Sequence, residues 1–510
     1  MTDASIPTTK TMAPLTGTVA AMTGAGEALG RSASTVFIKT LGCKVNTFDG
    51  NAIGNQFRAK GYTIVEHASE ADITVLNTCS VTSAADREAR YLIRRYRREN
   101  PEGRMVVTGC YAQTDSARLA AMKEVDFVVP NEAKERLVQF IEGETGRDRD
   151  RDNDSEAKGD GANAALDAAP APRTPASKMP ADVKAVTENR QSHFKSSLVL
   201  FDDASSSQTR AFVKIQDGCN GFCAYCLIPY ARGASRSVAP DQAFNEIKRL
   251  IDAGTPEIVL TGIHIGDYGR DLESYAGDAE PFATFVASIM EIPGLERLRI
   301  SSLEPGELSE DLLQVLKRHA DKFCPHFHLP LQSGDDRILK LMRRSYDTAG
   351  YEAAINLARE YFPDASFGAD VIPGFPSETA DEADATSAFI ERVGLNYLHV
   401  FPYSLRPNTS AARMPGHLGH EIVKERAARL RALSEKLAPQ YAAKFIGKTV
   451  DVLWEKDVDA QGRRSGLTRN YLNVLSASRQ NPAESPAPGT MAFCRVKGFT
   501  ETGKMLVVPV

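Results

Sequence analysis

The stretch Ala211–Arg236, AFVKIQDGCNGFCAYCLIPYARGASR, carries the most specific pattern in the 510-residue chain. An apolar run, Phe212 to Ile215, predicts a short strand, and a loop rich in glycine and cysteine follows it. The loop contains three thiols: Cys219, Cys223 and Cys226. Thiolates bind iron or zinc, but a structural zinc site takes four ligands, and no Cys or His follows until His264. We therefore predict a cluster held by three cysteines; a zinc knuckle, or a disulfide pair with a spare thiol, is the alternative.

The C-x3-C-x2-C spacing resembles that of radical S-adenosylmethionine (SAM) enzymes, and GCNGFCAYCLIPYARG, residues 218–233, is similar to their methylthiotransferase branch. The resemblance implies a 4Fe-4S cluster on Cys219, Cys223 and Cys226 with one iron left open to chelate SAM. An electron from the cluster cleaves SAM to a deoxyadenosyl radical, so the difficult chemistry belongs to the cofactor. Tyr225 takes the family's place for a residue beside the adenine of SAM, or it only packs the loop.

Composition sets the limits of the interpretation. A chain of 510 residues accommodates about three domains. The formal charge of −5 does not indicate a nucleic-acid binder, so such a role requires local basic patches. Eight cysteines are too few for a disulfide framework in a chain this long, which favours a reducing cytosol. No apolar run reaches the length of a membrane span, and residues 1–33 lack the features of a signal peptide and predict a disordered leader. We expect a cytoplasmic monomer.

Residues 34–143 contain a second set of three cysteines, each directly after a β-branched run. These are Cys43 after STVFIKTLG, Cys79 after ADITVLNT and Cys110 after MVVTG. Helical patterns separate the runs, so we predict an α/β domain with a Rossmann-like parallel sheet. The loops after parallel strands gather at one edge, where the three thiols should meet. Three unrelated small core residues are the alternative.

The motifs TLGCKVN, LNTCSVT and VTGCYAQ resemble those of the methylthiotransferase N-terminal domain. The resemblance implies that Cys43, Cys79 and Cys110 hold an auxiliary 4Fe-4S cluster, whose open iron is the site for the sulfur to be transferred. Asn46 and Asp49 follow the first motif as polar residues at the start of a helix, and we interpret them as caps.

A block of arginines between residues 87 and 98 gives a net charge of +5 in twelve residues, with Glu88 as its one acid. Its members are Arg87, Arg90, Arg94, Arg95, Arg97 and Arg98. The block is either a solvated helix face or a contact for RNA phosphates. Residues 144–207 then alternate charges and become rich in Ala and Pro, which predicts a disordered linker.

Residues 208–440 alternate strand and helix patterns in about six βα units, which predicts a partial barrel, the radical SAM core of the resemblance. Polar residues follow its strands. By resemblance of SSLEP and LPLQSG to the family, we expect Ser301, Glu304 and Gln332 near SAM. Arg232 and Arg236 are candidates for the SAM carboxylate or RNA phosphate, or they pair with acids.

The remaining histidines and cysteines that could bind a metal are interpreted as structural residues. His264 and His328 lie in apolar strand patterns and are expected as hydrogen-bonded core histidines, while Cys324 and Cys494 are expected as buried thiols.

Residues 441–510 show short strands with turns, which predicts a small β-barrel. Residues 447–510 contain nine Lys and Arg against six Asp and Glu, a net charge of +3 in an acidic chain. The segment resembles the RNA-binding TRAM module, and a generic stabilising barrel is the alternative. We interpret four residues as RNA contacts: Arg463, Arg464, Arg469 and Tyr471.

The resemblance implies a tRNA methylthiotransferase with two 4Fe-4S clusters, SAM as methyl donor and radical source, and an electron donor such as flavodoxin or ferredoxin. TLGCKVN points to threonylcarbamoyladenosine in the anticodon loop, where bases leave the stack. The substrate's carboxylate requires a cation, for which Lys44, Arg232 and Arg406 are candidates. The alternatives are isopentenyladenosine or a ribosomal-protein aspartate as substrate, or a non-catalytic iron-sulfur RNA-binding protein.

Overall fold

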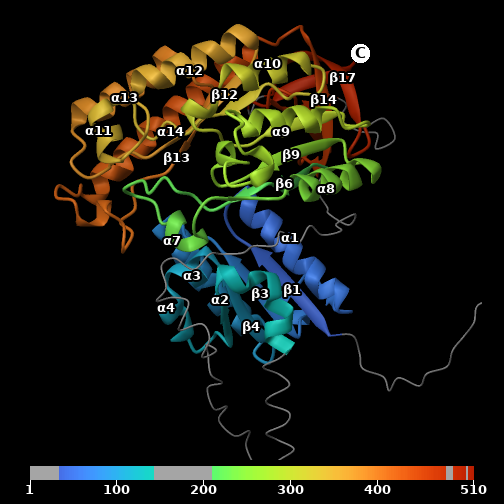
Figure 1. The fold of residues 1–510 in the computed structure, drawn as a ribbon, viewed down its shortest axis with the longest axis vertical. Coiled ribbons are helices and arrows are strands. Elements are labelled where there is room, and N and C mark those ends of the chain that lie inside the picture. The colour runs from blue at the N-terminus through green and yellow to red at the C-terminus, as the bar shows by residue number, and fades with distance from the viewer. Residues whose placement is uncertain (1–33, 143–208, 478–485, 501–502) are drawn as a thin grey trace, which may run out of the picture.

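The computed structural model describes residues 34–142, 209–477, 486–500 and 503–510. The predicted leader at 1–33 and linker at 144–207 lie outside the described residues. Three bodies follow one another along the chain: a parallel sheet with helices, a larger α/β body and a small β-barrel (Figure 1). The sheet body lies under the larger body in this view, and α1 (Lys44–Ala59) rises from it toward β6 (Ala211–Lys214).

The N-terminal sheet has five parallel strands in the order β2-β1-β3-β4-β5. Their bounds are β1 Thr35–Thr40, β2 Thr63–Ile64, β3 Ile73–Thr78, β4 Arg104–Gly109 and β5 Phe127–Val129. Besides α1, its helices are α2 (Ser83–Glu99), α3 (Cys110–Thr114) and α4 (Ser116–Ala120). Apolar residues of α1 pack with Val75 in one core, and those of α2 pack with Leu76 in another. Because neighbouring residues of a strand face opposite ways, the two helices cover opposite faces of the sheet, as predicted.

The central body is built on six parallel strands. β6, β9 (Glu257–Thr261) and β10 (Arg297–Ile300) form one sheet, and β11 (His326–His328), β12 (Ser366–Val371) and β13 (Tyr397–Val400) form another. Isolated parallel bridges, Leu298 with Phe323 and Ser302 with His328, join β10 to the β11 region. The strands therefore run in chain order as a partial barrel, which confirms the predicted six units.

Helices surround this barrel, and one large core of apolar side chains fills the space between helices and strands. The helices are α7 (Ile228–Arg232), α8 (Pro240–Asp252), α9 (Pro281–Met290), α10 (Glu310–Arg318), α11 (Asp336–Leu341), α12 (Thr348–Tyr361), α13 (Ala380–Val393) and α14 (His420–Ala443). A two-stranded ribbon of β7 (Gln216–Asp217) and β8 (Arg236–Ser237) closes the base of the cysteine loop.

The C-terminal body is a closed five-stranded barrel in the order β14-β15-β16-β18-β17. Its strands are β14 Thr449–Val458, β15 Arg464–Thr468, β16 Asn473–Ser476, β17 Met491–Phe499 and β18 Met505–Pro509. Trp454 is fully buried at its centre. The small barrel docks where β9 and β10 begin, because Arg299 donates to the carbonyl oxygens of Arg469 and Thr468 at 2.9 and 3.3 Å.

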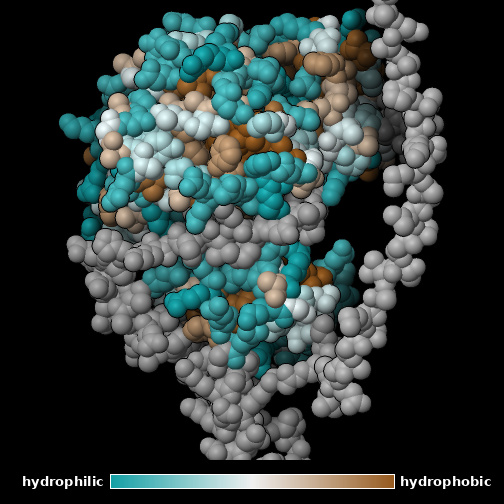
Figure 2. Space-filling model, turned by 45° about the vertical axis from the view of Figure 1, so that its right-hand side comes forward, coloured by the Kyte–Doolittle hydropathy of each residue, from teal (hydrophilic) through white to brown (hydrophobic). Residues whose placement is uncertain are grey.

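On the face drawn in Figure 2, hydrophilic residues cover most of the described surface, and hydrophobic ones gather mainly in patches on the upper body. In the described part of the chain, no helix combines the length and apolarity that crossing a membrane requires.

Candidate active site

The N-terminal cysteines lie at one edge of the sheet. Cys43 directly precedes α1, Cys79 follows β3, and Cys110 begins α3 after β4. Since β1, β3 and β4 are neighbours, the loops that carry the thiols are adjacent. Gly42 has φ +102°, and a Cβ there would lie 2.8 Å from the Cys79 Sγ. Only glycine lets the first loop approach the second thiol so closely.

These thiols influence one another electrostatically. Burial raises the pKa of Cys79 to about 12, and the neighbouring Cys110 and Cys43 thiolates add to the rise. The Asn131 side-chain nitrogen lies 3.6 Å from the Cys110 Sγ. Such a set of three converging sulfurs with an amide donor fits a three-cysteine iron-sulfur site.

The second cysteine triplet lies on the loop between β7 and α7, and several N–H groups point at its sulfurs. The Gly221 amide donates to the Cys219 Sγ at 3.3 Å, and the Ile228 amide donates to the Cys226 Sγ at 3.4 Å. Burial raises the pKa of Cys226 to about 12, with Cys223 and Cys219 as further causes. N–H groups directed at the sulfurs stabilise the thiolate form that a cluster requires.

Arg344 joins this loop to the barrel. Its Nη1 donates to the Cys223 Sγ at 3.0 Å, and its Nη2 pairs with the Glu304 carboxylate. Neither contact was predicted from the sequence, because Arg344 lies 121 residues beyond Cys223. Glu304, which we expected near SAM, is therefore connected to the cysteine loop through the side chain of Arg344.

His264 is not the core histidine that we predicted. It is half-buried in the loop after β9, with Nδ1 3.7 Å from the Cys219 Sγ. Its Nδ1 also lies 3.1 Å from Asp267, and its Nε2 lies 2.6 Å from Glu307. Although burial lowers the pKa of His264, hydrogen bonds to these partners raise it above its usual value. The apolar sequence around His264 concealed that its strand ends at Thr261.

The other residues expected near SAM follow the barrel strands. Ser301 follows β10, and Gln332 follows β11 with φ +65°. In the part of the chain that the structure covers, the buried Ser301 Oγ and Gln332 Oε1 have no hydrogen-bond partner. Buried polar atoms without partners are costly, so both fit the polar groups of a bound molecule. Tyr225 packs against an apolar cluster that includes Phe375.

A buried ion-pair network joins residues that follow the first N-terminal cysteine to residues that flank the cysteine loop. Arg232 donates to both carboxylate oxygens of Asp217 at 3.0 and 3.1 Å and to Asp49 at 3.0 Å. It also donates to the Asn46 Oδ1 at 3.2 Å. Asn46 and Asp49 are thus not helix caps, and Arg232 is not available to SAM, RNA or a substrate carboxylate. Arg236 contacts Asp217 as well, at 3.3 Å.

Arg406 is also occupied, so it cannot be the cation that we predicted for the substrate. It is buried, and it donates to Asp86 at 2.5 Å and to the Ser80 Oγ at 2.7 Å. Lys44 differs from it: within the described residues its ammonium has no ion-pair or hydrogen-bond partner. Burial, together with the positive charges of Arg299 and Arg210, lowers the pKa of Lys44 to about 8.

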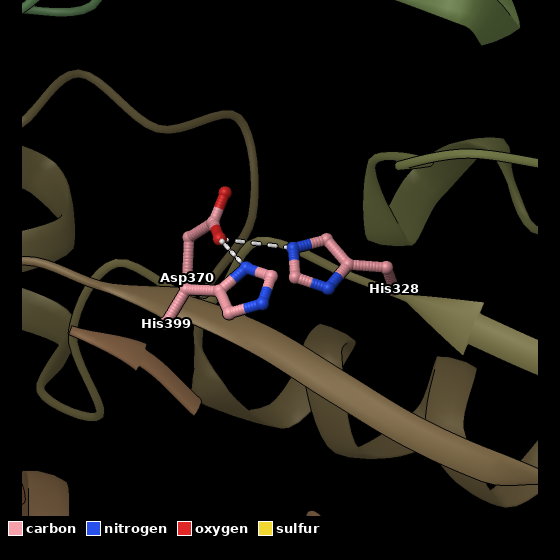
Figure 3. Close-up of side chains that lie close together, drawn as sticks. All are labelled: His328, Asp370 and His399. Atoms are coloured by element: carbon pink, nitrogen blue, oxygen red, sulfur yellow. Dashed lines mark hydrogen bonds and ion pairs between the residues drawn. The ribbon is translucent and has the colours of Figure 1, made fainter. Parts of the chain in front are cut away.

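A histidine–aspartate cluster lies along β11, β12 and β13 (Figure 3). One oxygen of Asp370 lies 2.9 Å from the His328 Nε2 and 3.2 Å from the His399 Nδ1. The His328 Nδ1 lies 3.2 Å from the Tyr397 hydroxyl, so both ring nitrogens of this buried histidine have partners. His328 is therefore a hydrogen-bonded core histidine, as predicted, and Cys324 and Cys494 are buried as predicted.

The four residues expected to contact RNA in the small barrel all make contacts within the protein. Arg463 is buried against Asp459 at 2.7 Å, and Arg464 donates to the Glu455 carbonyl oxygen at 3.0 Å. Arg469 faces Asp451 at 3.8 Å, and Tyr471 stacks on His326 with ring centres 4.1 Å apart. Arg463 is therefore buried within the small barrel and Tyr471 is covered by the large barrel, whereas Arg464 and Arg469 are half-exposed and their contact with RNA stays a prediction.

A different face of the small barrel is open. On β17, Phe493, Arg495 and Lys497 occupy alternate exposed positions, and Phe493 is 68 % exposed. An exposed aromatic ring followed by two cations on the same face suits RNA, which binds through base stacking and phosphate charge. In the sequence, apolar and basic residues alternate from Cys494 to Lys497, directly after Phe493. This alternation could have predicted an exposed basic strand face.

Helix α2 has a comparable stripe. Arg87, Tyr91, Arg94 and Arg98 are exposed at helical spacing on one face. Arg97 instead turns inward and pairs with Asp126. Three arginines of the block, Arg87, Arg94 and Arg98, therefore form an exposed stripe with Tyr91, whereas Arg97 belongs to the interior contacts of the domain.

Two family models match parts of the chain. The model of the uncharacterized protein family UPF0004 matches residues 35–130, and that of the radical SAM superfamily matches residues 213–390. The threonylcarbamoyladenosine tRNA methylthiotransferase MtaB of Bacillus subtilis (strain 168) is 36% identical over 87% of this chain and 90% of its own. The MtaB of Aquifex aeolicus (strain VF5) is 35% identical over 86% of this chain and 96% of its own.

A relative with another stated substrate is almost as similar. The tRNA-2-methylthio-N(6)-dimethylallyladenosine synthase of Syntrophus aciditrophicus (strain SB) is 32% identical over 82% of this chain and 83% of its own.

A radical SAM enzyme with an added N-terminal cysteine domain is the class that this fold and these matches define. The chain belongs to the radical SAM methylthiotransferase family. Its cofactors are accordingly SAM and two 4Fe-4S clusters. The two cysteine sets, the N–H donors at their sulfurs and the orphaned Ser301 and Gln332 atoms fit these groups.

Proposed function

We propose that the protein adds a methylthio group to carbon 2 of threonylcarbamoyladenosine in the anticodon loop of tRNA. The observation that carries the proposal is the arrangement of two three-cysteine sets on either side of the Arg232–Asp49 network, in a chain similar to MtaB along most of its length. A radical generated at one set can act on a base held next to the other.

We assign the SAM-binding cluster to Cys219, Cys223 and Cys226, and the auxiliary cluster to Cys43, Cys79 and Cys110. When bound, these groups supply the electron that cleaves SAM and the sulfur that is transferred. The chain's own part is to hold and orient. Ser301 and Gln332 offer buried polar atoms to SAM, and Arg344 fixes Glu304 relative to Cys223.

The tRNA reaches this site, in our proposal, along the stripe of α2 that carries Arg87, Tyr91, Arg94 and Arg98. The first turn of α2 lies at the boundary with the barrel, since Ser83 contacts Ser404 and Asp86 pairs with Arg406. Two exposed aromatic rings, Phe222 on the cysteine loop and Tyr230 on the following helix α7, have ring centres 6.2 Å apart. Aromatic rings of this kind stack on bases that leave the loop.

The partners and location of the working protein complete the proposal. A one-electron donor such as flavodoxin or ferredoxin reduces the SAM-binding cluster, and the protein acts as a monomer in the cytoplasm. The thiol-only cysteine usage of the chain supports a reducing compartment.

The experiment is to incubate the reconstituted protein with SAM, a reductant and tRNA that carries either threonylcarbamoyladenosine or isopentenyladenosine. Mass spectrometry of the digested tRNA should show the methylthio product only from the threonylcarbamoyl substrate. Product only from the isopentenyl substrate would move the protein to the sister branch. SAM consumption with no tRNA product from either would overturn the proposal.

A further inference from the structure

We propose that Lys44 binds the carboxylate of the substrate's threonylcarbamoyl group, and so selects this substrate over adenosines with an apolar substituent. The inference rests on the proposed function, and it assigns the enzyme's choice of substrate to one side chain. A buried carboxylate without a cation is costly, so a site for this substrate requires a positive charge that the protein does not already use.

Five other buried cations of the described residues, near one cysteine set or at the junction of the two bodies, are already paired. Asp49 alone contacts three of them, with the Lys214 Nζ at 2.6 Å and the Lys134 Nζ and Arg232 Nη2 at 3.0 Å. Arg344 pairs with Glu304, and Arg406 pairs with Asp86. Recruiting any of these for a ligand would strip a buried acid of its partner, which costs several kcal/mol.

Lys44 is placed differently. It is the first residue of α1 and directly follows Cys43, which we assign to the auxiliary cluster. Its side chain is half-buried, and in residues 34–142, 209–477 and the described remainder it has no ion-pair or hydrogen-bond partner. A lysine carries its charge on a flexible four-carbon stem, so it can follow a ligand placed next to the first cysteine.

The direction of Lys44 follows from its neighbour one turn along. Phe48 packs against the core of the large barrel, and the Lys214 Nζ of β6 lies 5.4 Å from its ring. Residues four apart share one face of a helix, so Lys44 is on the side of α1 that faces the barrel. The charges of Arg299, Arg210, Glu257 and Asp370 act on its ammonium, and all four residues belong to the barrel or its entry.

The chemistry of the substrate matches this position. In an adenine, carbon 2 and the carbon that bears the exocyclic nitrogen are separated by one ring nitrogen. A base whose carbon 2 faces the auxiliary cluster therefore places its N6 substituent a short distance from Cys43, within reach of the following residue. A threonylcarbamoyl carboxylate would neutralise Lys44, whereas an isopentenyl group would leave the ammonium desolvated and unpaired, which disfavours binding.

The test compares wild type with Lys44→Met, Lys44→Arg and a matched control, Lys60→Met. Lys60 immediately follows α1, and the one side-chain contact that it makes within the described residues is an exposed one with Glu142 at 3.7 Å. Two tRNA substrates are used: one with free threonylcarbamoyladenosine and one whose threonine carboxylate is a methyl ester. The readout is the ratio of kcat/KM for the acid to kcat/KM for the ester, with iron content measured for every preparation.

Wild type and Lys60→Met should prefer the acid by about 10–100-fold, the range of a charge-assisted hydrogen bond. Lys44→Met should bring the ratio near one, mainly through KM, and Lys44→Arg should restore most of the preference. A wild-type enzyme that does not distinguish acid from ester, or a Lys44→Met ratio equal to that of wild type, would overturn the inference. The acid-to-ester ratio of the wild-type enzyme tests the inference by itself, even if Lys44→Met loses its iron. If the protein modifies neither substrate, the proposed function has failed instead.

Discussion

Arg232 of the large barrel donates to Asp49 of the N-terminal domain, with 3.0 Å between Nη2 and Oδ2, although 183 residues separate them. Both side chains are buried, and the same Asp49 accepts from lysines of both bodies, Lys134 and Lys214. The Asp217 and Asp49 carboxylates, together with Cys110 and Cys43 in their thiolate form, hold the pKa of Arg232 well above its usual value despite burial. This contact fixes how the two cysteine sets face each other.

Replacing Asp49 with Asn should therefore destabilise the junction of the two bodies. The change leaves three buried cations without their shared acid, and breaking a buried pair costs roughly 3–5 kcal/mol. The thermal unfolding midpoint of the apoprotein should fall by several degrees, whereas Asp384→Asn, which removes an exposed pair with Arg429, should change it little. Equal midpoints for the two variants would show that the network does not hold the bodies together.

The two cysteine sets should carry separate clusters. Reconstituted wild-type protein should contain about eight irons, four for each cubane cluster. Replacing Cys43, Cys79 and Cys110 with Ala should halve the iron content and abolish methylthiolation, while reductive cleavage of SAM continues. If the variant keeps four irons but no longer cleaves SAM, the division of labour between the clusters is wrong.

Arg344 should tune the SAM-binding cluster. Its guanidinium donates to the Cys223 Sγ, and a positive charge at a ligand sulfur favours the reduced, more negative cluster. Arg344→Leu should therefore lower the reduction potential of this cluster and leave that of the auxiliary cluster unchanged, as measured by potentiometric titration with electron paramagnetic resonance. An unchanged or higher potential would contradict this role.

The exposed stripe of α2 should contribute salt-sensitive affinity for tRNA. Reversing the charges of Arg87, Arg94 and Arg98 to Glu should weaken binding at least tenfold and reduce the dependence of log Kd on log salt concentration. Arg392→Glu is the control, because this exposed residue of α13 pairs with Glu352 away from the stripe. Binding that keeps both its strength and its salt dependence would make the stripe an ordinary solvated surface.

Alkylation of the apoprotein should report the raised thiol pKa values. Only the thiolate reacts with iodoacetamide, and burial raises the pKa of Cys79 and Cys226 to about 12, so both are almost fully protonated at pH 7. Between pH 7 and pH 9 their alkylation rates, followed by peptide mass spectrometry, should rise about tenfold per pH unit. A rate that begins to level off by pH 9 would show that these thiols ionise at their ordinary pKa.

The local sequence was sufficient for the cysteine chemistry and for the fold class. Spacing along one loop unites Cys219, Cys223 and Cys226, and alternation of strands with helices dictates a parallel sheet with Cys43, Cys79 and Cys110 at one edge. These inferences succeed because metal-ligand spacing and hydrophobic periodicity are properties of short segments.

Only the tertiary structure decided which charged side chains are available. Arg232 and Arg406 are paired with acids 183 and 320 residues away, and Tyr471 is covered by His326 of the large barrel. Whether a cation faces a ligand or a distant carboxylate depends on how separate bodies dock, and a local pattern carries no information about that contact. Among the residues that the structure describes, the docking therefore leaves Lys44 without a partner beside Cys43, where the sequence alone had offered three equivalent candidates.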